Sequence, residues 1–220
     1  MMTPRVFRSR FNRVVAGVVW LGAAALCAAG LAAGGASSVV SGDASPGASG
    51  GELATFALAA LLAFTAWATL WHPRVSVGDD GVELRNVTHT VLVPWDAVIE
   101  VDTKYSLTVR TPRRVYSAWA APAPGRYASR NALRTRAMKA TADDGDPLRI
   151  PVGGARTSDL PSTDSGDAAA IVRAEWQRRL DGGLIAIGGA ETARVAVRVH
   201  AATLAALVAL GAAFVLAAIG

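Results

Sequence analysis

Three long uncharged apolar runs, at residues 14–33, 53–70 and 201–219, divide the chain. As helices they would each be about 27 to 30 Å long, enough to cross the roughly 30 Å hydrocarbon core of a bilayer. We therefore predict three transmembrane helices, assigned with their flanks to residues 14–36, 53–72 and 201–219. The third run is rich in alanine, which favours insertion less than leucine or phenylalanine, so a buried helix of a soluble domain is its alternative.

The segment between the second and third runs instead alternates apolar and polar residues with the period of a β-strand. The alternating apolar positions are Val82 and Leu84, then Val91, Val93 and Trp95, then Ile99 and Val101, then Leu107 and Val109, and residues 115–119. Six short strands fit before residue 120, and Leu148, Ile150 and Val152 indicate a seventh. Such alternation is typical of an antiparallel sheet with one face in water.

An amphipathic helix is predicted after these strands. Its apolar stripe, at spacings of three and four residues, consists of Ala169, Val172, Trp176 and Leu180. Asp167 is placed to cap its start, and Gly182 or Gly183 can end it. The expected fold class is membrane α plus β: transmembrane helices with a seven-stranded antiparallel barrel or sheet, capped by a C-terminal amphipathic helix.

The basic residues set the expected orientation in a membrane. All 22 lie before residue 14 or between residues 74 and 198, and none lies in the loop at 37–52. Cytoplasmic segments carry the excess of Lys and Arg, so we expect a multi-pass plasma-membrane protein whose N terminus and central domain are cytoplasmic. The alternative for the first run is a cleaved signal peptide, given its arginine-rich start and the small residues Gly34, Gly35 and Ala36.

The resulting layout has seven parts. They are a basic N terminus (1–13), a first transmembrane helix (14–36), an outer loop (37–52), a second transmembrane helix (53–72), a cytoplasmic domain (73–183) with a basic insertion (120–142), a linker (184–200) and a third transmembrane helix (201–219).

Two short motifs link the central domain to a known family. Residues 93–98 read Val-Pro-Trp-Asp-Ala-Val and resemble the Val-Pro-Trp-Asp-x-Val signature of small actinobacterial membrane proteins with a bacterial pleckstrin homology (PH) domain, of the low molecular weight protein antigen 6 type. Residues 80–86 are similar to the Asp-Gly-x-x-x-Arg-Asn sequence at the start of that family's second strand. The resemblance covers residues 1–119 and 146–182, and it implies a PH fold in which the final helix plugs one end of a bent sheet.

The same resemblance implies an interaction domain and no reaction. Phosphoinositide sites of eukaryotic PH domains use basic residues in the loop between the first two strands. Residues 78–81 here read Gly-Asp-Asp-Gly, so that ligand is not expected.

The sequence offers no motif for catalysis. The three histidines are remote from one another, and Cys27, the single cysteine, lies within an apolar run. Carboxylates at 79–80 and 143–146 sit beside glycine and are typical of turns, and no glycine pair has the Lys and Ser/Thr of a phosphate loop. We predict no catalytic residue, no cofactor and no metal site, and we expect a protein that is not an enzyme; an enzyme acting by itself is the minor alternative.

The basic insertion at 120–142 is the one candidate binding segment. Its candidate contacts to anionic lipid or a partner are Arg126, Arg130, Arg134 and Arg136. Each arginine near an anionic leaflet contributes about 1 kcal/mol, and the alternative is a solvated loop. Only Tyr127 interleaves with these arginines, so nucleic acid is not an expected partner.

The expected function is a non-enzymatic scaffold in a cell-envelope complex, with membrane lipids and another membrane protein as partners. The alternative is an accessory subunit of a transporter or envelope-synthesis enzyme that binds its partner through the transmembrane helices. A row of small residues at four-residue intervals in the third run, Ala201, Ala205, Ala209, Ala213 and Ala217, would let another helix approach closely.

Overall fold

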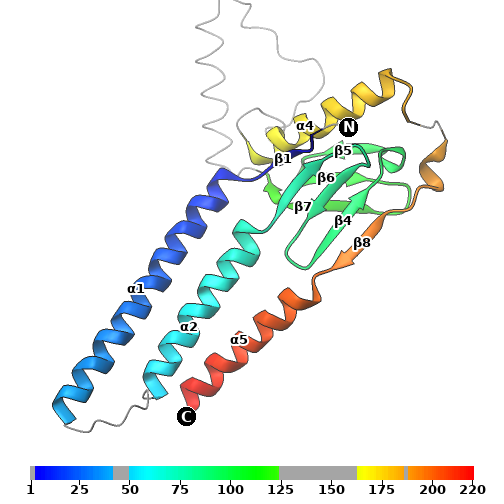
Figure 1. Ribbon diagram of the computed structural model, residues 1–220. Helices are drawn as coiled ribbons and strands as arrows, with labels where there is room; N and C mark the ends of the chain where they lie inside the picture. The colour runs from blue at the N-terminus through cyan, green and yellow to red at the C-terminus, as the bar shows by residue number, and fades with distance from the viewer. Residues whose placement is uncertain (1–2, 42–49, 124–162, 186–187) are drawn as a thin grey trace, which may run out of the picture. The chain divides into compact units, whose positions relative to one another are not determined.

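The computed structural model describes residues 3–41, 50–123, 163–185 and 188–220 (Figure 1). The chain divides into two compact units. The sheet unit comprises Met1–Ser9 and Pro73–Arg198, and the helical unit comprises Arg10–His72 and Val199–Gly220.

The helical unit contains α1 (Arg10–Ser41), α2 (Gly50–Ala66) and α5 (Ala201–Ile219). All three are long and apolar enough to cross a membrane, and they are the helices of that kind among the described residues. They correspond to the three predicted spans. Helix α2 contacts both α1 and α5.

The end of α2 widens into a π-helical turn, η1 (Trp67–Trp71). The backbone N–H of His72 donates to the carbonyl of Trp67 over 2.8 Å, which is the five-residue spacing of a π-helix. The ring of Trp71 lies 5.2 Å from that of Trp20 on α1, and the Arg13 guanidinium lies 4.5 Å from the Trp71 ring centroid. An indole and a cation from α1 therefore pack at the end of α2.

The sheet unit contains two antiparallel arrangements of strands. One sheet has the order β1-β2-β3-β4-β8, with β1 Arg5–Phe7, β2 Arg74–Val77, β3 Val82–Arg85, β4 His89–Val93 and β8 Ala196–Val199. The other has the order β5-β6-β7, with β5 Glu100–Asp102, β6 Ser106–Arg110 and β7 Val115–Pro122. Strands β3 to β7 lie at the five alternating segments, and β2 brings the number of described strands between residues 74 and 122 to the six expected.

The strand pattern differs from the prediction in four places. Strands β1 and β8 lie in segments that the sequence had indicated as a basic tail and a linker. Strand β4 ends at Val93, and Trp95 begins a short 3₁₀ helix, η2 (Trp95–Ala97). Strand β7 continues to Pro122, beyond the expected end at 119. The predicted seventh strand at 148–152 lies outside the described residues.

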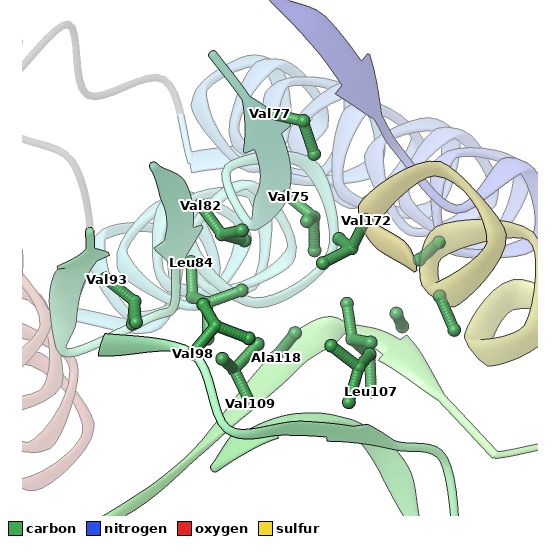
Figure 2. Packing of buried hydrophobic residues seen from close by; sticks show 14 of the residues in the cluster. Val75, Val77, Val82, Leu84, Val93, Val98, Leu107, Val109, Ala118 and Val172 are labelled. Carbon is green, nitrogen blue, oxygen red and sulfur yellow. The ribbon is translucent and has the colours of Figure 1, made fainter. Parts of the chain in front are cut away.

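Alternation along the strands produces one hydrophobic core (Figure 2). Its members include Val75, Val77, Val82, Leu84, Val91, Val93, Leu107, Val109 and Ala118, together with Ala168, Ala169 and Val172 of α4 (Asp164–Asp181). The inward residues of β2, β3, β4 and β6 are all apolar at every second position, as half-buried strands require. Trp95 is buried, as its apolar spacing had predicted.

Helix α4 confirms the predicted amphipathic helix but begins one turn earlier. Thr163, with extended backbone angles, is its N-cap, and the Thr163 hydroxyl accepts from the N–H of Gly166 over 3.0 Å. This hydroxyl satisfies an otherwise unpaired amide of the first turn, so Asp167 lies inside the helix and does not cap it. Gly182 is the C-cap, as predicted, but Leu180 is exposed at the edge of the expected apolar stripe.

The two units are joined by very short connections. Strand β1 runs into α1 with two residues between them, η1 runs into β2 with two residues between them, and β8 runs into α5 with one. Three of the five strands of one sheet are therefore each nearly continuous with one of the apolar helices.

Candidate functional site

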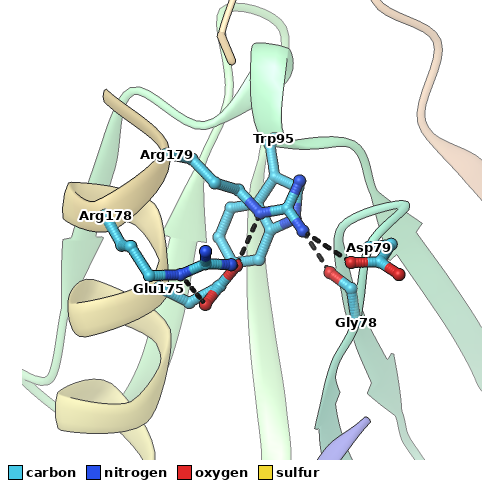
Figure 3. Close-up of polar contacts among 6 residues, drawn as sticks. All are labelled: Gly78, Asp79, Trp95, Glu175, Arg178 and Arg179. Atoms are coloured by element: carbon cyan, nitrogen blue, oxygen red, sulfur yellow. Dashed lines mark hydrogen bonds and ion pairs between the residues drawn. The ribbon is translucent and has the colours of Figure 1, made fainter. Parts of the chain in front are cut away.

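A connected group of polar side chains surrounds Arg179 on α4 (Figure 3). Arg179 Nε lies 2.7 Å from Glu175 Oε1, and Arg179 Nη2 lies 3.1 Å from Asp79 Oδ1 in the turn between β2 and β3. The guanidinium also lies 5.3 Å from the ring centroid of Trp95, whose indole N–H donates to the carbonyl of Gly78 over 3.0 Å. We call these residues, with Arg178, the Arg179 cluster.

Burial and charge in this cluster fix the ionised state of Glu175. The side chain of Glu175 is 2% exposed, and that of Arg179 is 11% exposed. The hydrogen bond from Arg178 is the main cause that lowers the pKa of Glu175, and Arg179 adds to it against the opposing effect of burial. The buried carboxylate is therefore charged and held between two guanidinium groups. Loss of either guanidinium would leave a buried charge with less compensation, which is costly.

The Arg179 cluster gives Asp79 of the acidic turn a structural contact. The carboxylate of Asp79 is bound to α4 through Arg179. The turn between β2 and β3 contains no basic residue, and through Asp79 it helps to hold α4 in place. The sequence had indicated a turn here without a ligand, and the geometry gives that turn a structural function.

Asn86 links the two sheets through hydrogen bonds of its side chain. Its side-chain amide donates to the carbonyl of Ser117 over 3.0 Å, and its side-chain oxygen accepts from the backbone N–H of Trp119 over 2.9 Å. Asn86 is buried and follows β3, whereas Ser117 and Trp119 belong to β7. One asparagine side chain thus serves as a hydrogen-bonding partner for the edge of β7.

Gly81, like Trp95 and Asn86, is a motif residue with a structural role. Its φ is +150°, and an added Cβ would lie 2.1 Å from the carbonyl oxygen of Val93. Gly81, Asn86 and Trp95 are the residues that carried the family resemblance, and each has a defined task in folding the domain. These three motif residues therefore act in folding the domain.

The structure brings together two histidines that the sequence separates widely. The rings of His72 and His200 lie 5.2 Å apart in the helical unit. His89, in the sheet unit, lies with Nδ1 2.8 Å from the Thr88 hydroxyl. Within the described ranges, no group of three His, Cys, Asp or Glu side chains is arranged to hold a metal ion.

The predicted contact residues of the basic insertion, Arg126, Arg130, Arg134 and Arg136, lie outside the described residues, as do the carboxylates at 143–146. Residues that sequence reasoning missed are Glu175 and Arg179. Their four-residue spacing on a predicted helix is typical of an ion pair, so that part of the cluster had a usable signal. No sequence signal indicated the contact between Arg179 and Asp79.

Exposed apolar side chains lie on β7, at one edge of the three-stranded sheet. Val115 and Trp119 are 56% and 57% exposed, although both belong to a strand whose alternate residues are buried. An exposed tryptophan is unusual on a soluble surface and is typical of residues that dominate protein interfaces.

Comparison with known families agrees with this geometry. Residues 72–174 match the bacterial PH domain family. The match covers β2 to β7 and extends into α4. No curated protein and no solved structure matches the chain. The sheet unit is thus similar to bacterial PH domains, and PH domains generally mediate interactions with proteins or lipids.

Proposed function

We propose that this chain is a non-enzymatic integral membrane protein that presents its PH-like domain at the inner face of the plasma membrane, as a scaffold in a cell-envelope complex. The observation that carries the proposal is the set of short connections. The start of α1, the end of η1 and the start of α5 each lie within two residues of a strand in one folded sheet. A single domain cannot occupy both sides of a membrane, so these three ends face the same side.

The distribution of arginine selects the cytoplasm as that side. Arg5, Arg8, Arg10 and Arg13 surround the start of α1, and Arg194 and Arg198 precede α5, whereas the loop at 37–52 contains no basic residue. Basic residues close to the ends of transmembrane helices are retained on the inner side. The connectivity and the charges therefore favour the same topology from separate observations.

Cysteine labelling tests this topology. Replacing the single cysteine by Cys27→Ser provides a background in which Ser117→Cys, on exposed β7, and Gly51→Cys, at the start of α2, each carry one thiol. A membrane-impermeant maleimide should label Gly51→Cys in intact cells and Ser117→Cys only after permeabilisation. Labelling of Ser117→Cys in intact cells would refute the proposal.

The accessory-subunit alternative has one observation in its favour. On α5, Ala201, Ala205, Ala209 and Ala213 are exposed, while the partly buried positions, such as Leu207, Leu210 and Phe214, lie on another face. Ala217, the fifth residue of the row, is partly buried. The first four residues of the row therefore leave a surface that a second helix could approach closely.

Affinity purification of the full chain from mild detergent separates the two functions. The scaffold proposal expects Trp119→Ala to reduce partner recovery and Ala209→Phe to leave it unchanged. The alternative expects the reverse, with Val208→Phe, at a 72% exposed neighbour outside the row, as the matched control. Contact of the insertion arginines Arg126, Arg130, Arg134 and Arg136 with lipid or partner remains part of the scaffold proposal, which includes no nucleic acid and no cofactor.

A further inference from the structure

A row of arginines crosses the outward face of the five-stranded sheet, beside the connections to the helical unit. Arg74 at the start of β2 lies directly opposite Arg85 at the end of β3. Extending the pairing of β1 with β2 by one residue beyond Phe7 places Arg8 opposite Arg74. Arg74 and Arg85 alternate with buried valine and leucine, so both side chains lie on the face away from the core.

The described carboxylates beside this row neutralise only part of its positive charge. Like charges directly opposite one another on neighbouring strands destabilise a sheet. The nearby carboxylate is that of Glu83, whose Oε1 lies 3.6 Å from Arg74 Nη2. Among the described residues, Glu83 is thus the carboxylate that pairs with this row of three guanidinium groups, which leaves an electrostatic cost that the sheet must bear or that an anion must offset.

Two of the guanidinium groups also contain unsatisfied donors. The Nε atoms of Arg74 and Arg85 are buried and have no hydrogen-bond partner within the part of the chain that the structure describes. Burial lowers the pKa of Arg85, the charge of Arg74 lowers it further, Glu83 raises it, and Arg8 lowers it again. Leaving buried donors without partners is energetically unfavourable, so a row that retains them is suited to an acceptor from outside the chain.

We propose that Arg8, Arg74 and Arg85 form a binding site for a phosphate group, supplied by the headgroup of an anionic lipid. A planar guanidinium can donate two parallel hydrogen bonds to phosphate oxygens, which makes arginine the preferred residue for this ligand. Arg8 lies two positions before α1, and Arg74 lies three positions after η1. Both are therefore placed by the sequence next to the ends of apolar helices, where headgroups lie.

The site includes Arg85 of the motif at residues 80–86 but is separate from the Arg179 cluster and from the basic insertion. It lies at the end of the β2–β3 hairpin opposite the acidic turn at residues 78–81, and it uses none of the insertion arginines. The assignment of a lipid as the source of phosphate rests on the proposed membrane anchoring. The phosphate site itself rests only on the arginine row.

Thermal unfolding of the full chain in an uncharged detergent tests the site. The additions are phosphatidylglycerol, an uncharged diacylglycerol, and inorganic phosphate at the same concentration as the lipid. The variants are Arg85→Gln and Arg74→Gln, with Arg114→Gln, an exposed arginine in the turn between β6 and β7, as the matched control. We expect phosphatidylglycerol to raise the Tm of the natural chain and of Arg114→Gln by several degrees, and to raise that of the two row variants far less.

The behaviour without phosphate distinguishes a binding site from a structural role. Arg85→Gln removes a repelling charge, so without added phosphate its Tm should equal or exceed that of the natural chain. A lower Tm without phosphate, together with a full response to phosphatidylglycerol, would overturn the site. An equal response to inorganic phosphate would support the site and overturn the lipid as its source. The phosphate measurements do not depend on topology, so they can fail or succeed independently of the cysteine labelling.

Discussion

Arg179 and Asp79 are one hundred positions apart in the sequence, and Arg179 Nη2 lies 3.1 Å from Asp79 Oδ1. This ion pair joins α4 to the turn between β2 and β3. Because Arg179 is also bound to Glu175 and lies over Trp95, one side chain connects α4, the turn and η2.

Removing the charge of Arg179 should destabilise the sheet unit strongly. Arg179→Gln leaves the buried Glu175 with one cationic partner fewer, and loss of a partner from a buried ion pair costs about 3 kcal/mol. Arg178→Gln is the matched comparison, because it also removes a cationic partner of Glu175 but keeps the contacts of Arg179 with Asp79 and Trp95. Thermal unfolding in mild detergent should show a much larger loss for Arg179→Gln, and equal losses would contradict the central position of Arg179.

Gly81 should not tolerate a side chain. In Gly81→Ala the added Cβ would meet the carbonyl oxygen of Val93 at a distance no real contact allows, and the backbone angle is one that alanine rarely adopts. We expect a loss of more than about 4 kcal/mol or failure to fold. Gly78→Ala is the control, since a Cβ there meets nothing within 4 Å, and its yield and Tm should stay close to those of the natural chain.

Asn86→Ala should separate the two sheets at one corner. The change removes the hydrogen bond from Asn86 to the Ser117 carbonyl and the one from the Trp119 N–H to Asn86, and a hydrogen bond contributes about 0.5 to 1.5 kcal/mol to stability. Amide hydrogen exchange should increase at Trp119. Thr88→Ala, at an exposed residue of the same turn, should leave that exchange unchanged; equal protection in both variants would argue against the bridge.

The raised pKa of Asp164 leads us to predict that the stability of the folded chain depends on pH. Burial raises the pKa of this carboxyl, a hydrogen bond from Ser9 lowers it, and Asp167 raises it, with a net rise. A folded-state pKa above the unfolded value means that stability is greatest below the unfolded value, about pH 4, and falls as pH rises through the folded pKa. Asp164→Asn should therefore raise the Tm at neutral pH and give little gain near pH 4.

Ser9→Ala provides the comparison for Asp164. It removes the hydrogen bond that lowers the pKa, so the decline of stability with rising pH should become steeper. A Tm for Asp164→Asn that is lower than natural at neutral pH would contradict this account.

Much of the fold could be predicted because period-two alternation was strong in the middle of the chain. Val82 and Leu84, like Leu107 and Val109, are buried as the pattern required. The prediction went wrong at Trp95, because it continued the alternation past Pro94, which has no N–H to donate and ends the strand.

The edge strands were missed for a different reason. Strand β1 is only three residues long and lies among arginines that were interpreted as a topological signal. Val197 and Val199 of β8 do alternate with Ala196 and Arg198, so a signal existed, but all four residues are exposed and the strand depends on its neighbour β4. Short edge strands are specified mainly by pairing, which a local pattern does not contain.

The polar connections were the least accessible to sequence reasoning. The contact of Arg179 with Asp79 and the alignment of Arg74 with Arg85 depend on tertiary packing and on strand register. A one-residue shift in register would place these side chains on the other face. In the sequence, the density of arginines indicated the insertion as the candidate binding segment. In the structure, strand pairing instead brings together Arg8, Arg74 and Arg85, which are far apart in the sequence.

The two outer strands of the five-stranded sheet have a practical consequence for recombinant work. A soluble fragment cut at residues 72 and 174, the limits of the family match, would lack both β1 and β8 and would also lose the end of α4. Its β2 and β4 would become bare edges, with free N–H and C=O groups that invite pairing between molecules. Such a fragment should aggregate, and its behaviour in solution would misrepresent the domain held in the intact chain.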